Sequence, residues 1–213
     1  MSLDIIKLKQ EENYWDAHAA LRIKIKGKSV SYNDNFYKRS KLLQKLLDYN
    51  FDETDVLEIG CAFSTISLAL KVCANLNSYK GIDVSEKYCE FARRVMGADA
   101  RKAKVNCLPF ESDSFNALFA FDVFEHINPS ERLDSYVEID RVLQNNARIF
   151  INNPLEETKH DLNFDHEFND KHIVELSSNL GMRIDKLQKY TVVLPPDSNK
   201  ISYQWIVMSR GNI

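Results

Sequence analysis

A short segment between a strand-like run and a helix-like run constrains this chain most. Residues 56–64 read VLEIGCAFS, in which an apolar run leads to Glu58 and Gly60, and further small residues follow at Ala62 and Ser64. Small side chains let a turning backbone come close to a ligand, and the N-terminal amides of the next helix attract negative groups. The segment therefore predicts a nucleotide-type binding turn between a strand and a helix.

The composition fits one enzyme-sized domain. The chain has 213 residues, of which 44% are hydrophobic, enough for one large core but not for two domains of ordinary size. A net charge of −3 gives no overall positive field, so we do not expect nucleic acid as a partner. The four cysteines have no paired spacing, which argues against a zinc site or a disulfide framework.

No segment of the sequence indicates a membrane or an export route. No apolar run reaches the roughly 18 residues needed to span a bilayer, and the N-terminus lacks the apolar core of a signal peptide. We therefore expect a cytoplasmic protein without a membrane partner. The sequence leaves a homodimer open.

Short β-like runs alternate with longer helical patterns after residue 50, which predicts a parallel sheet covered by helices. The expected strands are 56–59, 79–83, 101–106, 117–122 and 148–152, and the expected helices are 65–76, 86–96, 129–143 and 170–180. Two β-rich runs, 182–194 and 201–209, predict an antiparallel hairpin. In the third helix we expect Leu133, Val137 and Leu143 to face the core, and Asn145-Asn146 to end the helix.

An acidic residue at the end of the second expected strand suggests a ribose site. The carboxyl ends of parallel strands share one edge of a sheet, so Asp83 should lie close to the Gly60 turn. A carboxylate there can accept hydrogen bonds from both hydroxyls of a ribose. The alternative is an ordinary helix N-cap, a role for which Ser85 competes.

Five segments follow one another in an order and spacing typical of a single family. Residues 57–64, 81–85, 108–116, 124–127 and 141–146 are similar to the motifs LEIGCGTG, GVDLS, LPFPDNSFD, LEHI and RVLKPGG of the class I S-adenosylmethionine-dependent methyltransferases. The resemblance spans residues 54–152. A dinucleotide-binding site fits less well, because residues 60–65 lack the second and third glycines that let a pyrophosphate approach the helix.

The resemblance implies an α/β fold: a Rossmann-like, seven-stranded, mostly parallel sheet with an antiparallel C-terminal hairpin and helices on both faces. It divides the single domain into three parts. These are a helical lid at 1–50, a cofactor-binding core at 51–152, and an acceptor-side helix with the terminal strands at 153–213.

The resemblance also implies S-adenosyl-L-methionine as cofactor and assigns its contacts to the ends of successive strands. These contacts are Glu58, Gly60, Cys61 and Ala62 for the methionine part, Asp83 for the ribose, Val84, Asn106, Cys107 and Leu108 for the adenine, and Phe121 and Asp122 beside the sulfonium. Several positions depart from the family pattern. Ala62 and Ser64 stand where the family prefers glycine, which is tolerable if their φ is negative, and Lys104 stands where many members have an adenine-contacting Asp or Asn. Asn145-Asn146 replaces Pro-Gly, which exchanges one turn chemistry for another.

Methyl transfer is an in-line displacement that mainly needs alignment in a dry site. If the acceptor is a hydroxyl, His126 and His166 are the candidate catalytic bases, because a neutral imidazole suits that task near pH 7. The alternatives are a helix-start role for His126 and a surface-loop position for His166. Asp122, Glu125 and His126 resemble a divalent-ion motif of some methyltransferases, but metal-free members also carry Glu-His here, so we predict no metal.

The sequence therefore predicts an S-adenosylmethionine-dependent methyltransferase. We expect it to methylate an oxygen or nitrogen of a small molecule, such as a sugar or a biosynthetic intermediate. Two alternatives stay open: an RNA or protein methyltransferase, and a cofactor-binding but inactive subunit that works through a partner.

Overall fold

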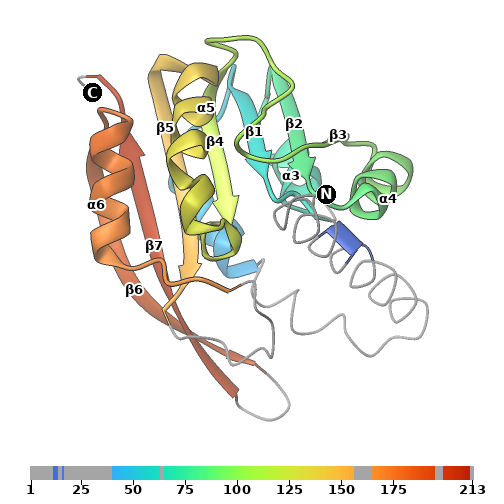
Figure 1. Cartoon of the computed structure of the whole chain (residues 1–213). Helices are drawn as coiled ribbons and strands as arrows, with labels where there is room; N and C mark the ends of the chain where they lie inside the picture. The colour runs from blue at the N-terminus through green and yellow to red at the C-terminus, as the bar shows by residue number, and fades with distance from the viewer. Residues whose placement is uncertain are drawn as a thin grey trace.

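The computed structural model describes residues 12, 13, 16, 40–62, 65–155, 165–194 and 199–211. Within them, one seven-stranded sheet has the strand order β3-β2-β1-β4-β5-β7-β6 (Figure 1). The ladders from β3 to β5 are parallel, and β7 pairs antiparallel with both β5 and β6. The predicted fold class, including the C-terminal hairpin, is confirmed. Most of the predicted lid lies outside the described residues, so the lid stays a prediction.

The element bounds follow the sequence pattern closely in most places. The strands are β1 (Asp55–Ile59), β2 (Ser78–Asp83), β3 (Asp99–Lys102), β4 (Phe115–Phe121), β5 (Leu143–Pro154), β6 (Arg183–Leu194) and β7 (Asn199–Ser209). The helices are α3 (Thr65–Cys73), α4 (Glu86–Met96), α5 (Arg132–Val142) and α6 (Asp170–Asn179), with 3-10 turns η1 (Phe124–His126) and η2 (Pro129–Glu131).

Helix α4 shows how local chemistry fixes an element. Ser85 is its N-cap, and the Ser85 side chain accepts a hydrogen bond from the backbone N–H of Tyr88. Gly97 ends the helix with a φ of 61°, a left-handed conformation that suits glycine. The predicted range 86–96 is therefore confirmed at both ends.

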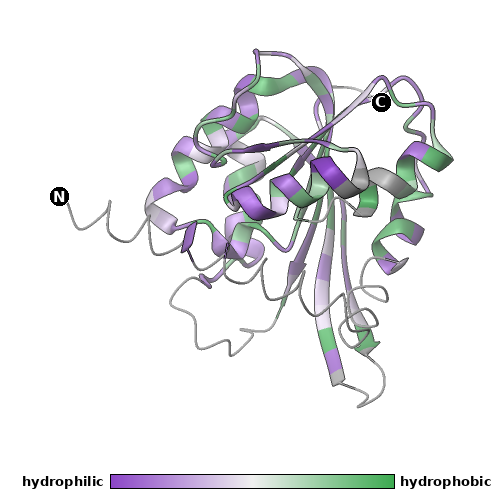
Figure 2. Cartoon of the chain, turned by 90° about the vertical axis from the view of Figure 1, so that its right-hand side faces the viewer, coloured by the Kyte–Doolittle hydropathy of each residue, from purple (hydrophilic) through white to green (hydrophobic). Residues whose placement is uncertain are grey.

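Two apolar clusters hold the helices against the two faces of the sheet. On one face, Tyr136 and Ile139 of α5 and Ile173 of α6 pack with residues of the central strands. On the other face, Ile66 and Leu70 of α3 pack with the aromatic residues of β4 and β5. Helices in Figure 2 carry both hydrophilic and hydrophobic residues, as expected where only one side is buried. None of the helices that the structure describes is long and apolar enough to cross a membrane.

The inward stripe predicted for α5 is wrong at Leu133 and Val137, whereas Leu143 is buried as predicted, although it begins β5. Leu133 and Val137 are 57% and 66% exposed, whereas Tyr136 and Ile139 are almost fully buried. The helix starts only at Arg132, after a 3-10 turn, and it ends at Val142. The larger side chains at spacing three take the buried face, because they bury more apolar area than Leu133 and Val137 would.

Two strand boundaries also differ from the prediction. The helix end expected at Asn145-Asn146 lies inside β5, which begins directly after α5. Strand β3 is Asp99–Lys102 rather than 101–106. After β3, the N–H of Ala103 donates to the carbonyl of Asp83 at 3.0 Å, and Cys107 closes a turn onto Lys104. Asn106 and Cys107 therefore lie in a loop beyond the strand.

Candidate functional site

The turn after β1 requires glycine at position 60. Gly60 has a φ of +66°, and an added Cβ would lie 2.5 Å from Cγ2 of Val123. The next residue, Cys61, donates its backbone N–H to the carbonyl of Ile82 at 2.9 Å. This bond fastens the turn to the neighbouring strand β2. Gly60 and Cys61 thus lie where the sequence predicted, at the carboxyl ends of β1 and β2.

Asp83 fastens the same turn through its side chain. Its Oδ2 accepts the backbone N–H of Ala62 at 3.0 Å, and its Oδ1 accepts the backbone N–H of Ser85 at 2.9 Å. The side chain is almost fully buried, and this burial raises the pKa of Asp83 to about 6, although the two N–H bonds oppose the shift. The predicted neighbourhood of Asp83 and the Gly60 turn is therefore present.

Glu58 lies below the turn, inside the sheet. It is 1% exposed, and the hydroxyl of Tyr79 donates to its Oε2 at 3.0 Å. In this structure the Glu58 side chain therefore links β1 to Tyr79 of β2, next to the loop. A contact between Glu58 and the charged end of the cofactor stays a prediction.

Ala62 was expected to replace glycine without strain if its φ were negative, and this condition is not met. Its φ is +43°, in the left-handed region that favours glycine. The bond from Ala62 N–H to Asp83 helps to hold this conformation. Asp122, at the end of β4, also has a positive φ, 58°. Both strained residues lie at the edge where the ligand was predicted, as strained backbone at functional sites often does.

The residues predicted to contact the adenine lie on two loops at this edge. Val84 and Asn106 are half-buried and Cys107 is exposed. Leu108 differs, because its side chain is part of the apolar cluster under α5. Its backbone N–H donates to Glu138 at 2.9 Å, which fixes the loop on α5. The Leu108 carbonyl in turn accepts from Arg141 Nη2 at 3.1 Å, so a contact between Leu108 and the adenine stays a prediction.

The Lys104 side chain forms an ion pair with an acidic residue. Its Nζ lies 3.3 Å from Oε1 of Glu131 on the 3-10 turn before α5. The lysine that replaces the family's Asp or Asn is thus neutralised by a contact with the other side of the loop. Because Glu131 pairs with Lys104, the departure from the family pattern leaves no isolated positive charge at the predicted adenine position.

A chain of hydrogen bonds joins β4, β5 and β6 at the same edge. Asp122 donates its backbone N–H to the carbonyl of Asn152 at 2.8 Å, and the Asn152 amide donates to Asp122 Oδ1 at 3.3 Å. The hydroxyl of Tyr190 donates to Oδ1 of Asn152 at 2.5 Å. Burial raises the pKa of Tyr190, so this hydroxyl stays protonated and remains a donor.

Sequence reasoning missed Asn152 and Tyr190. A polar residue ending an apolar strand was a usable signal for Asn152, but nothing in the sequence marks Tyr190, which comes from an antiparallel strand two ladders away. Phe121 was predicted beside the sulfonium. Its side chain is instead 2% exposed and stacks on Phe119 and Trp205, so it belongs to the core.

The two predicted histidines lie together just past β4. His126 Nδ1 lies 2.9 Å from Oδ1 of Asp165, and His126 Nε2 lies 3.9 Å from Oε1 of Glu125. His166 donates its backbone N–H to the carbonyl of Glu125 at 2.6 Å. His126 lies in the 3-10 turn η1 with its backbone N–H bonded to Val123, and His166 lies in a half-buried loop, so both alternatives stay open beside the cluster. Asp165 and the role of Glu125 were not predicted.

The surroundings of Glu125, His126 and His166 shift the pKa of each group. Burial raises the pKa of Glu125 to about 7. For His126, burial opposes the charged form, but the hydrogen bond with Asp165 and the charge of Glu125 outweigh it, so the pKa is raised. The pKa of His166 is lowered by burial and then by the charge of Arg132. The pKa values of the two histidines are therefore shifted in opposite directions.

No cluster of three or more His, Cys, Asp or Glu side chains that could hold a metal ion occurs among the described residues. Asp122, Glu125 and His126 occur in the order of the divalent-ion motif, but His126 is engaged by Asp165 at 2.9 Å.

A family model described as "Methyltransferase domain" matches residues 57–151. No curated protein matches the sequence. These matched residues contain the Gly60 turn, Asp83, Glu125 and His126, and they coincide with the segments that carry the five motifs.

Residues 57–151 therefore form a methyltransferase domain, and the fold of the chain is similar to those of S-adenosylmethionine-dependent methyltransferases. Solved structures support the fold. A SAM-dependent methyltransferase from Methanosarcina mazei is 19% identical, with a TM-score of 0.65, 78% of this chain covered and 96% of that chain covered. A putative methyltransferase from Haloferax volcanii, solved with the Trm112 methyltransferase activator, is 13% identical, with a TM-score of 0.71 and coverages of 95% and 98%.

A third methyltransferase structure contains the cofactor product. Geranyl diphosphate C-methyltransferase from Streptomyces coelicolor A3(2), in complex with Mg2+, geranyl diphosphate and S-adenosyl-L-homocysteine, is 11% identical, with a TM-score of 0.65 and coverages of 86% and 87%. The cofactor of this methyltransferase family is S-adenosyl-L-methionine. The Gly60 turn and the Asp83 carboxylate fit it, because they place backbone and an acceptor group at adjacent strand ends.

Replacing Ala62 by glycine should stabilise this methyltransferase. Glycine adopts a φ of +43° without the clash that Ala62 carries, and we expect a gain of about 0.5–1 kcal/mol in the free energy of unfolding. Urea denaturation measures it. The matched change Ala92→Gly in helix α4 should destabilise the protein, because glycine costs about 1 kcal/mol in a helix interior. Destabilisation by Ala62→Gly would contradict the backbone assignment.

Lowering the pH from 7.5 to 5.5 should stabilise the ligand-free methyltransferase through Glu125. Its folded-state pKa of about 7 lies above the unfolded value, so the folded state takes up more protons and stability is lost as pH rises through 7. We expect a gain of about 1–2 kcal/mol from this group on acidification.

The comparison variant for this pH dependence is Glu125→Gln, because the lowered pKa values of His166 and His172 act in the opposite direction in both proteins. Urea midpoints of the two proteins should converge as the pH falls. A constant difference across this range would show that Glu125 does not titrate there.

Proposed function

We propose that this methyltransferase transfers a methyl group from S-adenosylmethionine to an oxygen or nitrogen of a small molecule. The observation that carries the proposal is the Asp83 carboxylate fastened to the Gly60 turn by the Ala62 N–H. It supplies, at the ends of two neighbouring strands, an acceptor for ribose hydroxyls and a close backbone for the methionine part. Val84, Asn106 and Cys107 would line the adenine.

The charges beside the proposed acceptor position favour an acceptor that is not a polyanion. Asp122 ends β4, and the Glu125 and Asp165 carboxyls lie on either side of His126. Asn152 and Tyr190 extend the same wall with hydrogen-bonding groups. A hydroxyl or amine of a small molecule finds acceptors for its protons there, whereas the phosphates of RNA would meet carboxylates.

For a hydroxyl acceptor, we assign the role of general base to His166. Burial and the charge of Arg132 lower the pKa of His166, which favours the neutral imidazole that a base requires, whereas the pKa of the His126 ring between Asp165 and Glu125 is raised. The acceptor oxygen would give its proton to His166 as the oxygen attacks the methyl carbon and the thioether leaves. His126 would then position the wall of the pocket through the Asp165 contact.

Asp83→Ala should weaken binding of S-adenosylhomocysteine by about 2 kcal/mol, because charge-assisted hydrogen bonds to the ribose are lost. Isothermal titration measures the affinity. Asp99→Ala is the matched control, since Asp99 is an exposed acid on the adjacent strand β3 and, among the described residues, forms an ion pair only with Arg101 at 3.5 Å. Equal affinities of the two variants would count against the ribose assignment.

A measurement on the wild-type protein tests the same assignment even if the Asp83→Ala variant does not fold. Ribose hydroxyls favour the ionised carboxylate, so affinity for S-adenosylhomocysteine should fall as the pH drops below about 6, by roughly tenfold per pH unit well below the pKa. A flat affinity from pH 7.5 to 5 would contradict the assignment independently.

Transfer itself is tested with methyl-labelled cofactor and a panel of small-molecule alcohols, sugars and amines. We expect labelled product, and His166→Ala should lower turnover of a hydroxyl acceptor by 100-fold or more. Binding of S-adenosylhomocysteine should stay unchanged in that variant. Label found only in RNA or protein would favour the macromolecular alternative instead.

A second candidate function is methyl transfer that depends on a partner. The similar Haloferax volcanii methyltransferase was solved with an activator protein, and it matches this chain over 95% of its length. If the isolated chain binds S-adenosylhomocysteine but methylates nothing in the panel, turnover after adding an activator of the same class decides this alternative. Continued inactivity with the activator would favour the non-catalytic subunit.

A further inference from the structure

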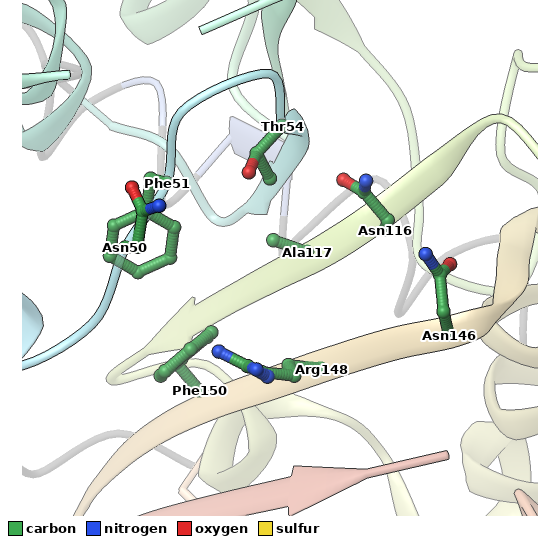
Figure 3. A pocket seen from close by; sticks show the side chains of 8 residues that line it. All are labelled: Asn50, Phe51, Thr54, Asn116, Ala117, Asn146, Arg148 and Phe150. Carbon is green, nitrogen blue, oxygen red and sulfur yellow. The ribbon is translucent and has the colours of Figure 1, made fainter. Parts of the chain in front are cut away.

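A hollow lies at the edge of the sheet opposite to the cofactor site. It is formed where β1, β4 and β5 begin, whereas Asp83 and Asp122 stand where β2 and β4 end. Its volume is about 160 Å³. Three chain segments contribute side chains to it (Figure 3), and the lining residues are Asn50, Phe51, Thr54, Asn116, Ala117, Asn146, Arg148 and Phe150.

Hydrogen bonds from the backbone determine which atoms of the Asn50 and Asn116 side-chain amides can bind a ligand. Oδ1 of Asn50 accepts the N–H of Asp52 at 2.9 Å, and Oδ1 of Asn116 accepts the N–H of Asp55 at 2.9 Å. Each amide oxygen is therefore occupied by a donor. The remaining NH2 groups of Asn50 and Asn116 are donors without a partner among the described residues.

Arg148 adds a positive charge to these donors. It is half-buried on β5, and its guanidinium has no ion pair or hydrogen bond with any residue that the structure describes. Figure 3 shows the Arg148 side chain beside Phe150, across the hollow from the segment that carries Asn50 and Thr54. A half-buried guanidinium is less solvated than an exposed one and is therefore suited to bind an anion.

No carboxylate is among the lining residues of the hollow. The nearest acids in the sequence have donors of their own. Asp52 Oδ1 accepts the N–H of Asn75 at 2.8 Å, and Asp55 Oδ1 accepts the hydroxyl of Ser78 at 2.6 Å. Since these acids face other segments, the hollow presents one cation and several neutral donors and lacks an internal counter-ion.

We propose that this hollow binds a tetrahedral oxyanion of the phosphate class. Arg148 would give two parallel charge-assisted hydrogen bonds, and the NH2 groups of Asn50 and Asn116 would bind the other oxygens from different chain segments. The volume suffices for a phosphate with water, because a single water needs only about 10–15 Å³ of such space. The site is separate from the proposed methyl-transfer site and does not rest on it.

The test is a titration of the isotope-labelled full chain with sodium phosphate at constant ionic strength. Side-chain amide signals of Asn50 and Asn116 and the Arg148 guanidinium signal should shift and saturate. Arg148→Gln should weaken the fitted affinity at least tenfold. Arg94→Gln, at an exposed position of helix α4, is the matched control and should leave the affinity unchanged.

A second variant keeps the test decisive if Arg148→Gln does not fold. Asn116→Asp can still accept the N–H of Asp55, but it puts a carboxylate into the hollow and should abolish phosphate binding. Shifts that never saturate, or that are equal in these variants and the wild type, would overturn the proposal. So would acetate binding as tightly as phosphate, because the assignment to a tetrahedral anion would then be wrong.

Discussion

The contact of one buried carboxylate with two backbone N–H groups organises the ligand edge of this protein. Asp83 ends β2, yet it binds the turn that follows β1 and the first residue before α4. One side chain thus fixes the relative position of two strands and a helix start. The desolvation that this burial costs is visible in the raised pKa of Asp83, about 6. Burial in the folded protein disfavours the charged carboxylate, whereas the hydroxyls of a bound ribose would favour it. Folding and ligand binding therefore have opposite effects on the charge of Asp83.

Part of this arrangement follows from the sequence alone. The strand before Gly60, the caps of α4 and the acid at the end of β2 depend on local chemistry, and their positions were predicted correctly. The buried face of α5 was not, because two apolar stripes compete on one helix and only packing against the sheet decides between them. The Tyr190 contact with Asn152 depends on the pairing of β6, β7 and β5, and no local pattern encodes that register.

The acceptor side shows the same division between local and long-range information. His126 follows β4 closely, so the motif located it, whereas Asp165 lies beyond a long connection and meets His126 only in the folded chain. That contact reverses the expectation from sequence, in which both histidines were equivalent bases. Burial and the charge of Arg132 lower the pKa of His166, whereas at His126 the contact with Asp165 and the charge of Glu125 outweigh burial and raise the pKa. Two histidines in one cluster thereby have pKa values shifted in opposite directions, which suits them to different roles.

Strand β5 connects the two proposed binding regions. Arg148, Phe150 and Asn152 alternate along it and therefore point to the same face of the sheet. Arg148 and Asn152 are four residues apart, about 13 Å at the rise of a β-strand. Pairing with β4 on one side and β7 on the other leaves this strand little freedom to shift. An anion at Arg148 would thus stabilise the sheet by mass action, while a change in acceptor affinity would require a movement of β5 that its two ladders oppose.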